Sequence, residues 1–171
     1  MKACIFDLDG TLTNTLESMT YSVNLTLEEM GLSKITKDQC RLFVGNGARV
    51  LIEKSLKAAG DTDASRIEEG MEIYGRIFDR NCTYHVTPYE GIPEMLKALK
   101  DKGIQLAVLS NKPDRQTVKV VKAIFGEELF DYPYRNITQT ATVHPVCRSD
   151  HLLPQFLTFF CPGIPTTHLS S

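Results

Sequence analysis

Residues 3–11 of the chain, Ala-Cys-Ile-Phe-Asp-Leu-Asp-Gly-Thr, decide the fold. The first four form an apolar run without polar alternation, which is typical of a strand buried on both faces of a parallel sheet. The run ends at Asp7 and Asp9, so both carboxylates follow the carboxyl end of the strand. Ligands of open α/β sheets bind in the crevice just outside these strand ends. The stretch therefore predicts an α/β fold whose functional site contains Asp7 and Asp9.

Two carboxylates at this spacing can serve several kinds of chemistry. Side chains alternate along an extended segment, so Asp7 and Asp9 project to one side and Leu8 to the other. Such a pair can hold a hard divalent cation, attack phosphorus or exchange protons, and Gly10 lets the backbone approach a ligand closely. The alternative is an ordinary Asp-rich turn after a strand. The position directly after an apolar strand favours the functional pair.

The composition of the chain limits its partners and its compartment. With 171 residues, 42% of them hydrophobic, the chain can bury a core and form one domain or two small ones. Its net charge of −2 gives no electrostatic reason to expect nucleic acid or an anionic membrane as a partner. The five cysteines form no C-x-x-C pair, which argues against a disulfide framework or a zinc site. No signal segment or spanning apolar run is evident, so we expect a soluble cytoplasmic protein.

An all-helical segment follows the first strand. Apolar periodicity predicts helices over residues 16–30, 37–43, 48–59 and 63–81. The last of these keeps its period in spite of Gly70 and Gly75. A helical insert after the first strand of an α/β sheet can form a lid that excludes water from the site. The alternative is a helical bundle without a gating role.

The chain then returns to the sheet. The sequence predicts a turn at 87–91, a helix over 93–102, a second apolar strand over 104–109 and a helix over 113–125. If the two strands are parallel neighbours joined by a right-handed crossover, Ser110 lies beside Asp7. A hydroxyl and free backbone N–H groups at a strand-to-helix turn can bind phosphate. Taken alone, Ser110-Asn111 could also be a simple helix N-cap.

The stretch from Phe6 to Leu12 resembles the signature motif of the haloacid dehalogenase superfamily, most of whose members are magnesium-dependent phosphohydrolases. The resemblance implies a Rossmann-type parallel sheet with an inserted helical cap. It makes Asp7 the nucleophile that forms an aspartyl-phosphate, and Asp9 the general acid and then the base. Asp7 and Asp9 would also hold Mg²⁺, the latter through its backbone carbonyl.

The insert and the second strand extend this resemblance. The insert is similar to the helical cap of the branch that includes phosphoglycolate phosphatase and β-phosphoglucomutase, and residues 43–49 resemble the phosphatase side of that branch. Arg49 is then a candidate to contact a substrate carboxylate, with a solvated side chain as the alternative. The resemblance also implies that the phosphoryl group is bound by Thr11, Ser110, Asn111 and Lys112.

The pattern changes after Asp131. Residues 132–171 contain no lysine but five prolines, which argue against central strands and long helices. The family pattern demands a phosphate-binding lysine, two further strands and a Gly-Asp-x-x-x-Asp turn here, whereas Asp150 stands alone. Loss of one preorganised stabilising group typically costs about 3 kcal/mol of transition-state stabilisation. Lys112 is the candidate to replace part of the missing charge.

These observations divide the chain and give it a function. We expect a partial core from 1–14 and 87–131, a helical cap from 15–86, and a tail from 132–171 that is poorly ordered or foreign to the fold. The expected function is Mg²⁺-dependent hydrolysis of a small phosphomonoester of the phosphoglycolate type, with impaired activity. The alternatives are β-phosphoglucomutase-like phosphoryl transfer and a non-catalytic fragment, truncated or frameshifted. The sequence leaves the oligomeric state open.

Overall fold

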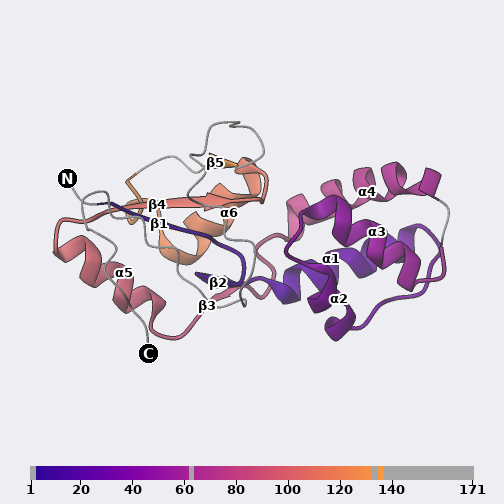
Figure 1. The fold of residues 1–171 in the computed structure, drawn as a ribbon, viewed down its shortest axis with the longest axis horizontal. Helices are drawn as coiled ribbons and strands as arrows, with labels where there is room; N and C mark the ends of the chain where they lie inside the picture. Colours follow the sequence, from indigo (N-terminus) through magenta and orange to yellow (C-terminus); the bar gives the residue numbers. More distant parts are fainter. Residues whose placement is uncertain (1–2, 62–63, 132–134, 137–171) are drawn as a thin grey trace, which may run out of the picture.

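A parallel sheet forms one lobe of the molecule and helices form the other (Figure 1). The computed structural model describes residues 3–61, 64–131 and 135–136. In the sheet, β1 (Ala3–Phe6) pairs in parallel with β4 (Gln105–Ser110), and β4 pairs in parallel with β5 (Arg135–Asn136). The two apolar strands predicted from the sequence are thus confirmed as neighbours, with Phe6 opposite Val108.

The sheet buries its two faces unequally. Along β1 and β4 fully buried residues alternate with half-buried ones: Phe6 and Leu106 are almost inaccessible, whereas Ile5 and Ala107 are half-buried. Because β1, β4 and β5 follow one another in the same direction, right-handed crossovers put the two connecting helices on the same face. These are α5 (Ile92–Asp101) and α6 (Asp114–Phe125). The sequence indicated burial on both faces, whereas the structure buries one face fully and the other by half.

The third strand lies inside the tail. Arg135 and Asn136 pair with Leu109 and Ser110, the last two residues of β4. The sequence predicted no strand after Asp131, so this prediction was wrong for β5. A two-residue strand at the edge of a sheet carries no alternation that a pattern could detect. Residues 137–171, which include Asp150, lie outside the described residues.

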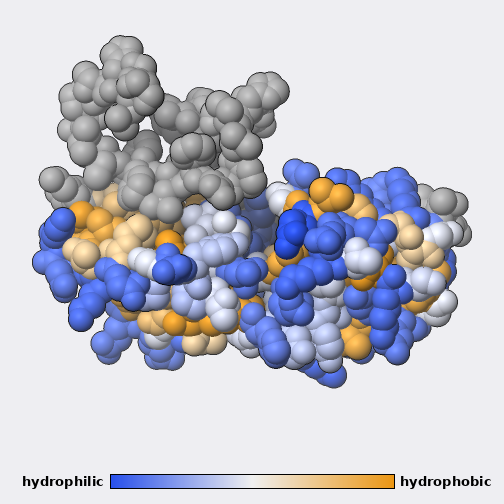
Figure 2. Space-filling view, turned by 90° about the horizontal axis from the view of Figure 1, so that it is seen from below, coloured by the Kyte–Doolittle hydropathy of each residue, from blue (hydrophilic) through white to orange (hydrophobic). Residues whose placement is uncertain are grey.

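The second lobe is an all-helical bundle, and the four predicted helices are confirmed to within a few residues. They are α1 (Leu16–Glu29), α2 (Lys37–Phe43), α3 (Ala48–Ala58) and α4 (Ile67–Asn81), the last preceded by a 3₁₀ turn at Ala64–Arg66. Figure 2 shows the two lobes side by side, with hydrophilic side chains over much of the visible face of the bundle. None of the described helices has the length and apolarity needed to cross a membrane.

A short antiparallel ribbon joins the lobes. It consists of β2 (Thr13–Asn14), where the chain enters the bundle, and β3 (Thr87–Pro88), where it leaves. The Tyr89 N–H donates to the Leu12 carbonyl at 3.2 Å and continues the pairing. The sequence predicted a turn at 87–91 and no strand at either place, because two-residue strands leave no periodic signal.

The two glycines of α4 give a test of its packing. Gly75 is exposed with open space around it, whereas a Cβ on Gly70 would lie 3.0 Å from Ile52 Cγ2 of α3. Alanine favours a helix over glycine by about 1 kcal/mol, so we expect Gly75→Ala to raise the free energy of unfolding by about that amount. Gly70→Ala should be less stable than Gly75→Ala by about 1–3 kcal/mol, because α3 must move. Urea denaturation measures both; equal gains would contradict the tight α3–α4 packing.

Candidate active site

The loop after β1 fixes the two aspartates. Leu8 and Leu12 are fully buried, and the Leu8 carbonyl accepts hydrogen bonds from the N–H groups of Leu12 and Thr13, both at 3.0 Å. Gly10 has a φ of 80°, a conformation that glycine adopts without strain. The loop thus reverses the chain within a few residues. In the chain, Asp7 precedes and Asp9 follows the buried Leu8, at the end of β1.

Ser110 lies against Asp7. It is the last residue of β4, and its hydroxyl is close enough to the Asp7 carboxylate to help lower the pKa of that group. The Lys112 backbone N–H donates to Ser110 Oγ at 3.2 Å, which closes the turn before α6. Asn111 is exposed in this turn. The structure therefore brings together the ends of β1 and β4 and their polar residues.

The Lys112 side chain crosses the site instead of extending into water. Its Nζ lies 3.1 Å from Asp9 Oδ1, and only 2% of the side chain is exposed. The ring of Phe78, from α4 of the helical lobe, lies 4.6 Å from Nζ. The ammonium group is thus placed between a carboxylate and an aromatic face.

The surroundings of Asp7 make its charge unfavourable. Partial removal of water, followed by the nearby charge of Asp9, raises the pKa of Asp7 to about 6. The Leu8 N–H, which donates to Asp7 Oδ1 at 2.7 Å, the Lys112 ammonium and the Ser110 hydroxyl act in the opposite direction. Additional positive charge at this place would lower the pKa of Asp7 and favour the carboxylate form.

The donor atoms fit a magnesium ion that shares its shell with substrate. Mg²⁺ commonly takes one or two carboxylates, several waters and substrate phosphate oxygens. Asp7 is exposed at the strand end, so its carboxylate can reach a bound ion, whereas Asp9 Oδ1 is ion-paired with Lys112 and the Asp9 backbone carbonyl is the second candidate donor. No group of three or more acidic, histidine or cysteine side chains suitable for a metal occurs among the described residues. A metal here would therefore depend on Asp7, Asp9 and the substrate.

Thr11 and Arg49 lie less centrally. The half-buried Thr11 donates its N–H to the Leu8 carbonyl at 3.3 Å, within the loop. Arg49, in the first turn of α3, forms an ion pair of 2.6 Å with Glu68 in the first turn of α4. Glu68 is ten residues from Phe78, about 15 Å along the helix at 1.5 Å per residue. Contact between Arg49 and substrate thus requires a different arrangement from this one, and its role stays a prediction.

Comparison of the sequence with models of known protein families identifies the family of this chain. The profile described as haloacid dehalogenase-like hydrolase matches residues 4–142, most of the chain. The chain belongs to the haloacid dehalogenase-like hydrolase family. The match includes both strand ends and continues past Asp131, where the motifs recognisable in the sequence stop.

Relatives within the haloacid dehalogenase-like family are phosphatases by name. The phosphoglycolate phosphatase of Aquifex aeolicus is 36% identical over 131 residues, which cover 77% of this chain and 59% of that protein. The phosphoglycolate phosphatase of Haemophilus influenzae (strain 86-028NP) is 35% identical over 133 residues, covering 73% and 58%. The chain thus spans less than three fifths of these relatives.

A solved structure shares the haloacid dehalogenase-like fold. The crystal structure of a predicted phosphoglycolate phosphatase from Haemophilus somnus 129pt superposes with a TM-score of 0.73 at 27% identity. The matched region covers 82% of this chain and 64% of that one. The predicted fold class, a parallel α/β sheet with a helical insert, is confirmed.

Sequence reasoning missed Phe78 as part of the site. The periodicity of α4 placed Phe78 on its apolar face, and Phe78 is indeed buried. The same signal is produced by any core residue of a helix. Only the folded arrangement shows that this ring meets Lys112, which lies 34 residues further along the chain.

The raised pKa of Asp7 predicts a pH-dependent stability. The ordinary pKa is 3.8, so folding binds a proton between about pH 4 and 6, and the ionised carboxylate destabilises the folded chain above that range. In metal-free buffer we expect Asp7→Asn to raise the Tm near pH 7, and the gain to shrink as the pH falls toward 4. Asp38→Asn, an exposed control, should show no such trend. A gain that is equally large at both ends of the range would contradict the burial effect.

Proposed function

We propose that this chain is a phosphatase that hydrolyses a small phosphomonoester of the phosphoglycolate type with Mg²⁺ as cofactor. Asp7 is the nucleophile and Asp9 the general acid and base. Ser110, Asn111, Thr11 and Lys112 bind the phosphoryl group. The observation that carries the proposal is the Lys112 ammonium 3.1 Å from Asp9 Oδ1, at the parallel-paired ends of β1 and β4 where Asp7 and Ser110 also lie.

In the first step an Asp7 carboxylate oxygen attacks phosphorus, and the bond from phosphorus to the substrate alcohol oxygen breaks. Protonated Asp9 gives its proton to the departing alkoxide, which leaves as the alcohol. The Ser110 hydroxyl and the Asn111 backbone N–H are the donors for the phosphoryl oxygens, where negative charge develops.

In the second step water attacks the phosphorus of the aspartyl-phosphate. Asp9, now ionised, accepts a proton from that water, and the bond between phosphorus and Asp7 breaks to release phosphate. Asp7 and Asp9 would hold Mg²⁺, which when bound neutralises charge on the phosphoryl oxygens. Lys112 supplies a second positive charge from the protein itself, because its ammonium is fixed beside the aspartate pair.

A specific observation also favours a second candidate, a chain that binds metal or phosphate without turnover. The described residues offer no group of three or more acidic, histidine or cysteine side chains that could hold a metal ion. A metal held by the Asp7 carboxylate and the Asp9 backbone carbonyl alone is bound more weakly than one held by a further carboxylate. Such a chain would bind a phosphate ester through Ser110 and Lys112 without completing the reaction.

Turnover of p-nitrophenyl phosphate and phosphoglycolate, with and without Mg²⁺, tests the proposal. We expect Mg²⁺-dependent release of phosphate, and a loss of at least about a thousandfold in kcat for Asp7→Asn, because the nucleophile is removed. Asp38→Asn should keep full activity. Turnover that survives in Asp7→Asn would refute the assigned nucleophile. No turnover, together with a broad and uncooperative thermal transition, would favour the non-catalytic fragment.

Lys112→Gln tests the charge that the protein supplies. The glutamine removes the ammonium beside Asp9, so we expect kcat to fall by about a hundredfold, the usual effect of losing one stabilising donor. Lys97→Gln, an exposed change on α5, is the matched control. Steady-state kinetics at saturating Mg²⁺ measure both; an unchanged kcat in Lys112→Gln would show that Lys112 has no part in the reaction.

A further inference from the structure

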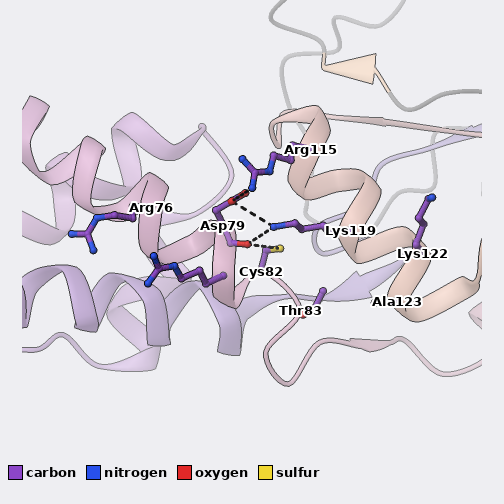
Figure 3. A pocket seen from close by; sticks show the side chains of 9 residues that line it. Arg76, Asp79, Cys82, Thr83, Arg115, Lys119, Lys122 and Ala123 are labelled. Carbon is purple, nitrogen blue, oxygen red and sulfur yellow. Dashed lines mark hydrogen bonds and ion pairs between the residues drawn. The ribbon is translucent and has the colours of Figure 1, made fainter.

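The last turn of α4 makes two contacts with the sheet lobe through consecutive residues. Phe78 places its ring 4.6 Å from Lys112 Nζ. Asp79 Oδ2 forms an ion pair with Arg115 Nη2 at 2.7 Å and lies 3.5 Å from Lys119 Nζ. The Lys119 ammonium also donates to the Asp79 backbone carbonyl at 2.7 Å. Figure 3 shows Arg115 and Lys119 pointing from α6 toward Asp79.

These contacts fix α4 against the helix that starts directly after Lys112. Arg115 and Lys119 are four residues apart and therefore lie on one face of α6. The Asp79 carboxylate has two cationic partners, and the Asp79 carbonyl, near the negative end of α4, accepts a further hydrogen bond. Together these contacts restrict the position and the rotation of the last turn of α4. We call this set of contacts the Asp79 strap, consisting of Asp79, Arg115 and Lys119. Asp79 of the strap directly follows Phe78 in the chain.

Phe78 is itself held in a defined orientation. Only 4% of its surface is exposed, and its ring stacks on Tyr74 with centroids 5.1 Å apart and an interplanar angle of 12°. A ring fixed in this way presents its face, which carries partial negative charge, to the ammonium group.

We propose that Phe78 is a positioning residue that seats the Lys112 ammonium against Asp9, and that the Asp79 strap holds Phe78 in that place. The ring attracts the cation without competing for the phosphoryl group, because it offers no hydrogen-bonding atom. The helical lobe thereby contributes to the site through an apolar side chain. The effect on turnover rests on the proposed function, whereas the seating of Lys112 does not.

Native-state acetylation of lysines, followed by mass spectrometry, measures the seating without any need for turnover. A side chain that is 2% exposed should react slowly. We expect Phe78→Leu to raise the labelling rate of Lys112 by about tenfold or more, and Phe78→Tyr, which keeps the ring, to leave it low. Asp79→Asn should also raise the labelling rate of Lys112, because it weakens the Asp79 strap. Phe125→Leu makes the same chemical change at the end of α6 and should have no effect.

Kinetics give the second measurement. We expect kcat to fall by about tenfold in Phe78→Leu with little change in KM, and Phe78→Tyr to restore it. The proposal is overturned if labelling of Lys112 is the same in Phe78→Leu and the native chain, or if Phe125→Leu has an equal effect. It is also overturned if Phe78→Tyr behaves like Phe78→Leu, because the ring face would then not matter. Increased labelling in a chain without turnover would support the seating of Lys112 and refute the proposed phosphatase.

Discussion

The site depends on one electrostatic constraint, the proximity of two carboxylates at the end of a buried strand. Asp7 and Asp9 flank the fully buried Leu8 in the chain, and the charge of Asp9 raises the pKa of Asp7. The Lys112 ammonium, 3.1 Å from Asp9 Oδ1, offsets part of this negative charge. Opposite charges about 4 Å apart attract by about 4 kcal/mol at an effective dielectric constant near 20, before the cost of removing water. This attraction holds a positive charge at the strand ends, where a phosphate group would bind.

The core of this arrangement could be predicted from the sequence. An apolar run that ends in Asp7-Leu8-Asp9-Gly10, and a second that ends in Ser110, give both the strands and their carboxyl ends. Their parallel pairing was the condition for placing Ser110 beside Asp7, and the register of β1 against β4 meets that condition. The helices could be predicted as well, because each buries one face and its apolar residues therefore recur every three to four positions. Local patterns that repeat over several turns are what the sequence makes visible.

The remaining features arise from contacts between distant segments. The ribbon of β2 and β3 and the strand β5 contain two residues each, too few for any alternation. The half-burial of Ile5 depends on which face the connecting helices cover, and an apolar run is the same in either case. Lys112 could be named as a phosphate ligand from its neighbours in the chain. Its place between Asp9 and Phe78 required the fold, because the ring comes from the other lobe.

The register of the sheet has a consequence for how the chain folds. Ala3 pairs with Gln105, so the central contact joins residues about a hundred positions apart. Closing such a loop from a disordered chain is entropically costly and slow, whereas helical bundles dominated by local contacts form quickly. The bundle between the strands joins its two ends through Thr13 and Pro88. Once the bundle has formed, β1 and β4 are tethered near each other, and the long loop becomes a short one. The inserted helices thus act as an internal folding aid for the sheet that they interrupt.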